Sequence, residues 1–445
     1  MLSVAVVGSG PAGVYAAEAL TRYAGDVRVD VLDSLPTPFG LVRYGVAPDH
    51  PVTQSIAGTL AAVLEQPQVR FFGNVRVGTD LTVAELRDHY DAVLVATGAA
   101  VDRRLSIPGE ELTGSVSATS FVAWYAGSPD TPPGAFRLDA RQAVVVGAGN
   151  VAGDVARMLA RTPAELAATD VPDHVLAAFA ASRVEEVHLV ARRGPAQARF
   201  TTRELRELGE LADADVVVDP ADLEPDDVSE ADLQSSAAAR RNLDVLRRWA
   251  GQAPAGRSRR VHLHFFSRPV AITGDDRVAG MRIERTRFAP DGTLAGTGEE
   301  QELPAQLVVR AVGYRSLPVP GLPFDEGAGV VPHEAGWVHR GGVPEMGTYV
   351  AGWAKRGPTG VIGTNKHDAR ETVRTLLADV PSLDLAPVRD PEALPQLLAD
   401  RGVQVVTWDG WLAIARAEAR RGEAQGRARA KISDRAEMLR LAAEG

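Results

Sequence analysis

The chain has 445 residues, a formal net charge of −10 and no cysteine. This length allows two or three domains, and the acidic balance argues against nucleic-acid binding, which needs a basic face. The lack of cysteine excludes disulfides, thiolate nucleophiles and an iron–sulfur cluster held by the chain itself. No apolar run is long enough for a membrane span, and the N-terminus begins with a strand pattern rather than a signal peptide. We therefore expect a cytoplasmic protein that does not bind membranes.

The first predicted elements form a strand, a glycine-rich turn, a helix and a second strand. Residues 3–8 (SVAVVG) predict a buried strand, residues 8–13 read G-x-G-x-x-G, and a helix is predicted for Val14–Tyr23. The next strand, Val27–Asp33, ends in an acid. This spacing predicts a dinucleotide-binding unit with the pyrophosphate at the helix N-terminus and an acid that accepts from a free ribose 2′-OH. FAD or NAD fits this pattern. The predicted cofactor contacts are Gly8, Gly10, Ala12, Gly13 and Asp33.

The same pattern occurs a second time, with a different strand end. A strand predicted for Gln142–Gly147 leads into G-x-G-x-x-A, with Gly147 and Gly149 as the predicted contacts, and then a helix over Val151–Arg161. The following strand, Glu186–Ala191, ends at Arg192 and Arg193 rather than at an acid. The guanidinium fork matches a phosphate dianion, so we favour NADP over NAD.

An alternative interpretation of the arginine pair remains open. Arg-Arg pairs also begin at residues 103, 240, 247, 259 and 420. The pair could therefore merely end a strand in an arginine-rich protein. Its position directly after the second strand of a dinucleotide-binding unit is what favours the functional interpretation.

The order of these elements predicts an α/β fold with two Rossmann-like domains, as in glutathione reductase. Two apolar strands predicted for Asp91–Ala99 and Gln306–Tyr314 bracket the second glycine motif. We expect an NADP-binding domain at residues 101–314 inserted into an FAD-binding domain formed by residues 1–100 and 315–445. The segment after Pro381, with a helix over Trp411–Arg420, is predicted to be a surface appendage.

Four longer segments carry a family resemblance. They are PFGLVRYGVAPDHP (residues 38–51), GAGNVAGDVAR (147–157), ARRGPAQARFTTRELREL (191–208) and GWAKRGPTGVIGTN (352–365). Together they resemble the adrenodoxin reductase family, above all its bacterial NADPH–ferredoxin reductases, over nearly the whole chain. Asp33 departs from the glutamate, and Gly153 from the leucine, that are usual in the family. The resemblance implies that NADPH passes a hydride to FAD, which passes single electrons to a ferredoxin-type iron–sulfur protein.

The resemblance also implies contacts to the flavin. The backbone N–H groups before a helix predicted for Asn365–Leu377 would face the flavin ring, and further side chains would lie against FAD. From their pattern alone, these side chains read as core or as an ordinary turn. The implied FAD contacts are Leu41, Val77, Trp353, Gly360, Val361 and Ile362.

The resemblance places His50 near the flavin, paired with a carboxylate of the helix predicted for Thr202–Leu211, for which Glu207 is the candidate. His50 would then position the nicotinamide or handle the proton of flavin N5. Glu204 has two interpretations: a capping box with Thr201, or a contact near the NADP ribose. The other implied NADP contacts are Asn150, Val151 and Arg103.

Two other classes of function stay open from the residues alone. A flavin-dependent monooxygenase or oxidase would share both glycine motifs, and a non-enzymatic NADP-binding redox sensor would need only the nucleotide-binding units. An acidic ferredoxin would need a local basic surface on this acidic chain. The predicted members of that surface are Arg199, Arg203, Arg206, Lys355 and Arg356.

Overall fold

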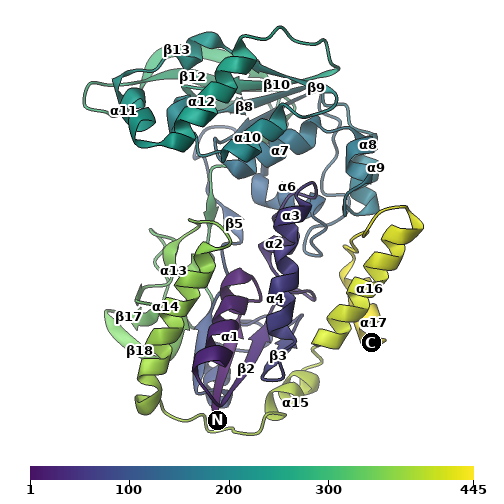
Figure 1. Cartoon of the computed structure of the whole chain (residues 1–445), viewed down its shortest axis with the longest axis vertical. Helices are drawn as coiled ribbons and strands as arrows, with labels where there is room; N and C mark the ends of the chain where they lie inside the picture. Colours follow the sequence, from purple (N-terminus) through teal and green to yellow (C-terminus); the bar gives the residue numbers. More distant parts are fainter. The chain divides into compact units, whose positions relative to one another are not determined.

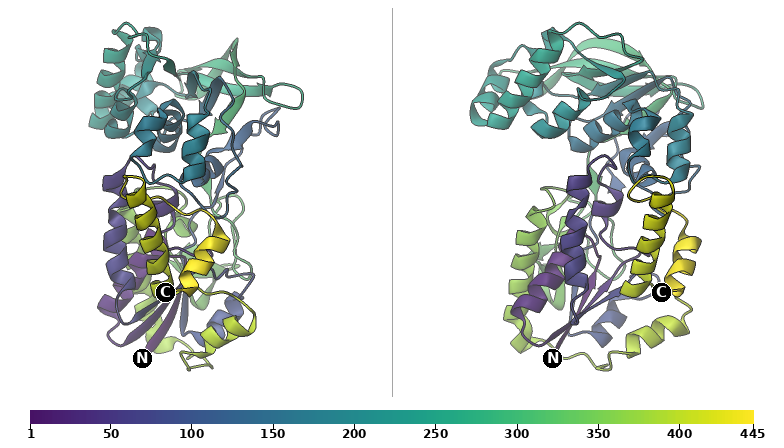
Figure 2. Two further views of the ribbon diagram at one scale, coloured as in Figure 1. Left: turned by 90° about the vertical axis from the view of Figure 1, so that its right-hand side faces the viewer. Right: turned by 45° about the vertical axis from the view of Figure 1, so that its right-hand side comes forward.

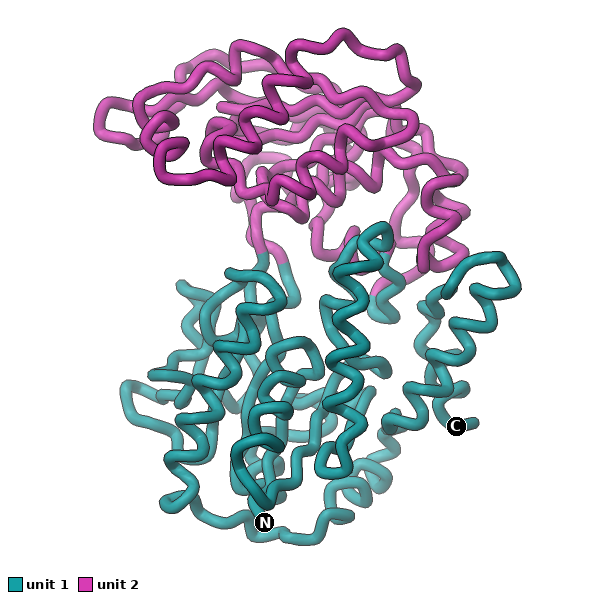
Figure 3. Tube along the Cα trace, viewed as in Figure 1, with its two compact units in different colours: residues 1–101, 126–130, 314–445 teal, residues 102–125, 131–313 magenta.

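The computed structural model describes residues 1–445 and separates into two compact units. Unit 1 comprises residues 1–101, 126–130 and 314–445, and unit 2 comprises residues 102–125 and 131–313 (Figure 3). Each unit contains one of the two glycine motifs. The assignment of residues 126–130 to unit 1 is a feature that the sequence did not indicate.

Unit 1 is built on a seven-stranded sheet with the order β16-β17-β18-β4-β1-β2-β3. Strands β18, β4, β1, β2 and β3 are parallel, and β16, β17 and β18 pair antiparallel at one edge. The strand bounds are β1 Leu2–Val7, β2 Val27–Leu32, β3 Val69–Phe72, β4 Ala92–Val95, β16 His333–Glu334, β17 Trp337–Arg340 and β18 Val343–Val350.

The apolar run at the N-terminus forms the central strand because both faces of the sheet are covered. Val4 and Val6 of β1 belong to the core on one face, while Ala5 and Val7 belong to the core on the other. A strand buried on both sides has no need of alternating polar residues. The helix α1 (Pro11–Tyr23) lies beside α14 (Thr364–Asp379), and both contribute to the first of these cores (Figure 1).

The remaining helices of unit 1 have at most nine residues, except α16, which has 17. Their bounds are α2 Leu41–Tyr44, α3 Pro51–Gln54, α4 Ile56–Leu64, α5 Val83–His89, α13 Trp353–Arg356, α15 Ala393–Asp400, α16 Trp408–Ala424 and α17 Arg435–Ala443. The 3₁₀ turn η3 spans Val380–Ser382, and the short strands β5 (Val101–Asp102) and β15 (Tyr314–Arg315) pair with each other.

The segment after Pro381 is not the surface appendage that we expected. The helices α16 and α17 lie side by side (yellow in Figure 2), and Trp411, Ile414 and Met438 are buried in the core of unit 1. The expectation was wrong because a helix rich in charged residues can still bury one face. On α16 that face also carries Glu418, a fully buried carboxylate paired with Arg43 of α2.

Unit 2 contains a six-stranded, fully parallel sheet with the order β6-β14-β7-β8-β10-β9. A three-stranded antiparallel sheet, β11-β12-β13, shares an apolar core with β7, β8 and β14. The strand bounds are β6 Ser115–Ser117, β7 Gln142–Val146, β8 Glu186–Val190, β9 Ala214–Val218, β10 Arg259–His264, β11 Ser267–Thr273, β12 Gly280–Phe288, β13 Leu294–Pro304 and β14 Leu307–Arg310.

The helices of unit 2 include the two that carry candidate site residues, α7 and α10. Their bounds are α6 Ala118–Tyr125, α7 Asn150–Ala160, α8 Pro163–Ala167, α9 Asp173–Ala180, α10 Thr202–Leu208, α11 Asp227–Ser235 and α12 Ala237–Ala250, with 3₁₀ turns η1 Pro195–Gln197 and η2 Pro220–Leu223. Helix α7 continues unbroken through Gly153, so the departure from leucine does not interrupt it.

Candidate functional site

The first glycine turn connects β1 to α1, and two of its glycines are required by the fold itself. Gly8 has φ +110°, and a Cβ there would overlap the carbonyl oxygen of Ala96, the residue directly after the neighbouring strand β4. A Cβ at Gly13 would overlap the carbonyl oxygen of Gly8. These two glycines therefore set the tight turn and the close packing of helix on strand.

Gly10 is different, because nothing in the chain requires it. Its φ is −68°, and a Cβ there would meet no atom within 4 Å. Gly10 is also the N-cap of α1, and no side chain caps that helix end. The open space at Gly10 and the uncapped N–H groups fit the pyrophosphate of a dinucleotide.

Asp33, directly after β2, holds the first turn in place. One carboxylate oxygen accepts hydrogen bonds from the Ser9 backbone N–H at 2.8 Å and from the Ser9 hydroxyl at 2.5 Å, and the other accepts from Leu35 N–H at 2.9 Å. Burial raises the pKa of Asp33, and these hydrogen bonds act against that rise. A carboxylate has about four lone-pair sites, so the oxygen bonded only to Leu35 can still accept from a ribose hydroxyl.

Two further segments of unit 1 lie against this turn. Gly40 (φ +49°) has no room for a side chain, because its Cβ would lie 3.1 Å from the Cα of Gly10. Gly352 (φ +75°) would place a Cβ 2.5 Å from that of Ala12. Three distant parts of the sequence, which all carry motif residues, therefore meet at the first glycine turn.

The predicted flavin contacts occupy accessible positions near these segments. Leu41, Val77 and Trp353 are half-buried, which fits a contact to a ligand as well as to the core. Trp353 packs on Tyr314 with ring centroids 5.4 Å apart, and its indole N–H donates to the Thr359 carbonyl at 3.2 Å. The predicted N–H donors lie before α14, whose N-cap is Gly363 without a side-chain cap. Those donors are Gly360, Val361 and Ile362, of which Val361 is 69% exposed.

His50 lies at the start of α3 in unit 1 and is 4% exposed. Its backbone N–H donates to Ala47 at 3.0 Å, and its carbonyl accepts from Gln54 at 3.0 Å. The backbone of this histidine is therefore held on both sides by the loop that connects α2 to α3. Its predicted partner Glu207 belongs to unit 2 and is described there.

The second glycine turn, between β7 and α7, resembles the first: one glycine is required by the packing of the chain, and another faces open space. A Cβ at Gly147 (φ +148°) would overlap the carbonyl oxygen of Ala311 and lie 3.2 Å from the Cβ of Ala152. Gly149 has φ −122°, meets nothing within 4 Å and caps α7 without a side chain. The second turn thus offers the same open glycine and helix N-terminus for a second pyrophosphate.

The arginine pair after β8 combines a fixed backbone with unpaired, exposed side chains. The Arg192 carbonyl accepts from the Thr286 hydroxyl at 2.8 Å, and the Arg193 carbonyl accepts from Phe266 N–H at 3.1 Å. Both guanidinium groups are exposed, and neither has a carboxylate partner within the chain. Two free guanidinium forks on an anchored backbone fit a phosphate group.

Other predicted NADP contacts border the second turn, and one further residue joins them. Asn150 begins α7 and its side-chain oxygen accepts from Thr201 N–H at 2.8 Å, while Val151 follows it. Arg103 is exposed in unit 2, with its N–H donating to Gly313 at 2.9 Å. Arg199, which we had assigned only to the basic surface, donates its N–H to Ala148 within the turn at 2.7 Å. Nothing in the second glycine motif predicted this hydrogen bond, because Arg199 and Ala148 are far apart in the sequence.

Glu204 and Glu207 of α10 share a buried arginine of α7. Arg157 is fully buried, and its guanidinium lies 2.8 Å from Asp154, 3.5 Å from Glu204 and 3.3 Å from Glu207. Thr201 caps α10 by accepting from Glu204 N–H at 3.3 Å, but no capping box forms, because the Glu204 carboxylate turns to Arg157 instead. The capping-box interpretation of that carboxylate was therefore wrong.

Two residues of the predicted basic surface, Lys355 and Arg356, are paired with carboxylates inside unit 1. Lys355 is 4% exposed and paired with Asp368 at 3.2 Å and with Glu371, and Arg356 pairs with Asp368 at 2.9 Å. These cations hold α13 on α14 and are not available to a partner. Arg199, Arg203 and Arg206 are exposed, as predicted.

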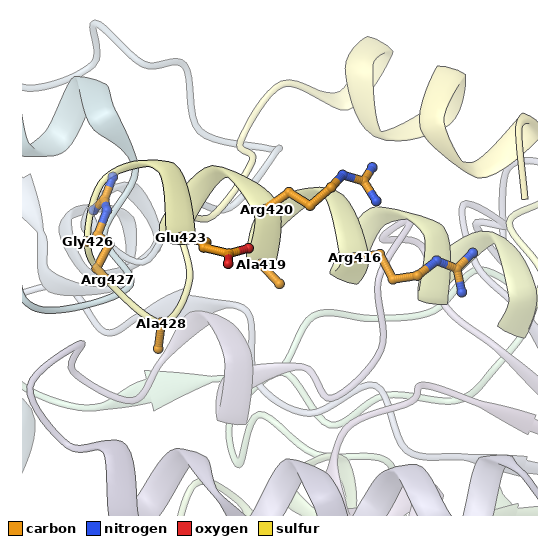
Figure 4. Close-up of a pocket in the computed structure, with 7 residues that line it drawn as sticks. All are labelled: Arg416, Ala419, Arg420, Glu423, Gly426, Arg427 and Ala428. Atoms are coloured by element: carbon orange, nitrogen blue, oxygen red, sulfur yellow. The ribbon is translucent and has the colours of Figure 1, made fainter.

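Unit 1 has a second set of accessible cations along α16. Arg416 and Arg420 are exposed and line a shallow groove, together with Glu423, small residues and the buried Arg427 that follows the helix (Figure 4). The groove contains no residue of either glycine turn. Its chemistry suits an acidic surface rather than a dinucleotide.

Comparison with known proteins agrees with this geometry. The sequence profile of the pyridine nucleotide-disulphide oxidoreductase family matches residues 2–211. The chain is 44% identical over 454 residues to the NADPH-ferredoxin reductase FprA of Mycobacterium tuberculosis, with 98% of each protein covered. This chain belongs to the adrenodoxin reductase family of NADPH–ferredoxin reductases.

Another relative and a solved structure are also similar to this chain over nearly its whole length. The mitochondrial NADPH:adrenodoxin oxidoreductase of Arabidopsis thaliana is 40% identical over 463 residues, covering 99% of this chain and 95% of that protein. The structure of Mycobacterium tuberculosis FprA in complex with NADPH matches with a TM-score of 0.93 and 43% identity over 99% of both chains. The two-domain α/β fold predicted from the sequence is confirmed. None of the helices combines the length and apolar character that a membrane crossing requires.

Proposed function

We propose that this chain is an NADPH–ferredoxin reductase, which moves electrons from NADPH through FAD to a ferredoxin-type iron–sulfur protein. The observation that carries this proposal is the pair of glycine turns with opposite strand ends. Asp33 follows the strand beside the first turn, and the unpaired Arg192 and Arg193 follow the strand beside the second. An acid suits an unphosphorylated ribose, and paired arginines suit a 2′-phosphate.

The two turns assign the cofactors to the units. Unit 1 would hold FAD, with the pyrophosphate at Gly10 and the N-terminus of α1, and unit 2 would hold NADPH at Gly149 and the N-terminus of α7. When bound, FAD supplies the capacity to accept a hydride and to release electrons one at a time. The chain contributes binding and orientation, and it has no cysteine with which to reduce a disulfide.

The remaining site residues would position the reacting groups. We propose that Arg157 fixes the carboxylates of Glu204 and Glu207 on α10, since its buried guanidinium lies 3.5 Å from the first and 3.3 Å from the second. Glu207 and His50 would orient the nicotinamide or handle the proton of flavin N5. A cytoplasmic location stays a prediction, to be checked by cell fractionation.

Replacing the open glycines tests the assignment of the cofactors. Gly10→Ala and Gly149→Ala should both fold, because their φ angles suit alanine and a Cβ meets no atom of the chain. We expect Gly10→Ala to lose FAD, whereas Gly149→Ala should keep FAD and bind NADPH more weakly, since each methyl group fills the space of a pyrophosphate. Flavin absorbance after gel filtration and NADPH titration measure the two effects.

Gly58→Ala is the matched control, because its Cβ also meets nothing within 4 Å but it lies on α4. This variant should retain both cofactors. If Gly10→Ala affected only NADPH, or Gly149→Ala only FAD, the assignment of the cofactors to the units would have to be reversed.

The dependence of turnover on salt tests the proposed acceptor. NADPH-driven reduction of cytochrome c should require added ferredoxin and should slow as salt is raised, because an acidic ferredoxin must meet exposed arginines on a chain of net charge −10. Between about 0.01 M and about 0.15 M salt the screening length falls from about 30 Å to about 8 Å. Turnover with ferricyanide, a small acceptor, should change much less over the same range.

Two results would contradict this reaction. Equal salt dependence with both acceptors would argue against docking through a basic surface. Ferredoxin-independent consumption of NADPH and oxygen, with an oxygenated product, would instead support a flavin-dependent monooxygenase.

A further inference from the structure

Arg199 lies at the second glycine turn, although it is far from that turn in the sequence. Its backbone N–H donates to the carbonyl of Ala148 at 2.7 Å, and Arg199 forms an isolated parallel β-bridge with Gly149. Arg199 shortly precedes α10, and α10 lies beside α7, the helix that begins at the turn (Figure 1). The backbone of Arg199 is therefore fixed at the place where α7 begins.

The β-bridge also sets the direction in which the arginine side chain leaves the backbone. Bridged residues lie about 5 Å apart, and their side chains begin on the same side of the paired backbones. A Cβ built on Gly149 would meet no atom within 4 Å. The Arg199 side chain therefore starts toward the open space in front of Gly149.

The guanidinium group of Arg199 is available to a ligand. Arg199 is exposed and forms no ion pair within the chain. The carboxylates of Glu204 and Glu207 on the adjacent helix α10 face Arg157 instead. An exposed guanidinium on a fixed backbone, next to an open glycine, fits an anionic ligand.

The first glycine turn contains the same backbone hydrogen bond with a different side chain. There the Phe39 N–H donates to Ser9, the residue between the first two glycines, at 3.1 Å, just as the Arg199 N–H donates to Ala148. Phe39 is 5% exposed and belongs to the core of unit 1. The turn therefore does not need a charged residue at this position. The exposed charge of Arg199 points to a role toward the ligand of unit 2.

The pyrophosphate is the part of NADPH that this position fits. Helix α7 offers it backbone N–H groups, since its N-cap Gly149 has no capping side chain. Arg192 and Arg193 follow β8 and are assigned to the 2′-phosphate. No side-chain cation is yet assigned to the pyrophosphate, which a guanidinium binds through its paired N–H donors.

We propose that Arg199 binds the pyrophosphate of NADPH beside the N-terminus of α7, rather than an acidic ferredoxin. This inference rests on the proposed binding of NADPH by unit 2. Arg199 would strengthen the binding of NADPH and NADH to the same degree, because both contain the pyrophosphate. Arg192 and Arg193 would discriminate between the two nucleotides, because only NADPH has the 2′-phosphate.

Arg199→Ala in the FAD-loaded enzyme tests this assignment with two nucleotide fragments. ADP-ribose contains the pyrophosphate but no 2′-phosphate, whereas 2′-AMP contains the 2′-phosphate but no pyrophosphate. We expect the variant to bind ADP-ribose about tenfold more weakly, the value of one charge-assisted hydrogen bond, and to bind 2′-AMP as the parent does. Inhibition of NADPH-driven ferricyanide reduction measures both affinities. The ratio of kcat/KM for NADPH and NADH should stay unchanged.

Two further variants serve as controls. Arg199→Lys keeps the charge without the paired donors, so it should lose less affinity for ADP-ribose than Arg199→Ala. Arg241→Ala removes the same charge from unit 2, and Arg241 is exposed on α12 and forms no ion pair. This variant should bind ADP-ribose as the parent does. FAD content and melting temperature should be unchanged in all variants, which shows that a loss of affinity is not a loss of fold.

Three results would overturn the inference. Unchanged binding of ADP-ribose by Arg199→Ala, with a raised KM for ferredoxin, would return Arg199 to the basic surface. A loss of the preference for NADPH would place Arg199 at the 2′-phosphate instead. A parent enzyme that bound neither fragment would contradict the assignment of NADPH to unit 2 itself, so a failure of the proposed function is distinguishable from a failure of this inference alone.

Discussion

Replacing Arg192 or Arg193 by alanine is expected to weaken NADPH binding by roughly one to two decades and to leave NADH binding nearly unchanged. Each arginine would contribute charge-assisted hydrogen bonds to the 2′-phosphate worth about 1.5–3 kcal/mol, at about 1.4 kcal/mol per factor of ten. The turnover number at saturating NADPH should survive, because this contact is equally present in the ground state and the transition state. The ratio of kcat/KM for NADPH and NADH, with ferricyanide as acceptor, measures the effect.

A second arginine pair of unit 2 provides the control. Arg247 and Arg248 are exposed on α12 and lie outside the glycine turn. Alanine at these positions removes the same charge and should keep the preference for NADPH. If the double substitution of Arg192 and Arg193 left the preference intact, the pair would merely end a strand. Equal loss of both nucleotides would point to misfolding.

Replacing Glu418 by glutamine is expected to destabilise unit 1 by about 3–5 kcal/mol, because it leaves the Arg43 guanidinium buried without a counter-charge. Arg43 is 6% exposed and Glu418 is fully buried, and two guanidinium nitrogens face the two carboxylate oxygens. Glu418 also accepts from Ile432 N–H at 2.9 Å. The pair thereby joins α2 to α16 and to the segment before α17. Thermal unfolding followed by flavin fluorescence reports both stability and loss of FAD.

A double replacement separates the cost of one unpaired charge from the value of the pair. Arg43→Met with Glu418→Leu removes both charges and should recover much of the lost stability, since apolar residues often replace a buried ion pair at little cost. Glu444→Gln is the control, because Arg440 and Glu444 form an exposed pair that should contribute at most about 1 kcal/mol. A Glu418→Gln variant as stable as Glu444→Gln would contradict this prediction.

The sequence by itself determined the two dinucleotide-binding turns. The residues that define each turn lie within a few positions of one another, so a short stretch of sequence is enough to predict the turn. Gly8 and Gly147 need positive φ, and the open Gly10 and Gly149 follow two residues later. The valine-rich strands before them are buried on both faces, so their pattern needs no knowledge of their neighbours.

Only the tertiary structure decided which charged residues are available for function. Lys355 and Arg203 both read as surface cations in the sequence, but Lys355 is buried against carboxylates of α14 whereas Arg203 is exposed. Glu204 fits a capping box by its spacing, yet its carboxylate turns to Arg157, a residue 47 positions away. A charged side chain follows the partner that long-range packing brings to it, and spacing along the chain does not encode that partner.

The same reason explains the C-terminal helices and a contact between two histidines of unit 2. Glu418 becomes a core residue only because Arg43 approaches it from 375 positions away. His188 and His262 come together only through the parallel register of β8 and β10. Local spacing specifies turns, helix starts and strand ends, whereas strand pairing and helix docking bring together residues that no motif connects.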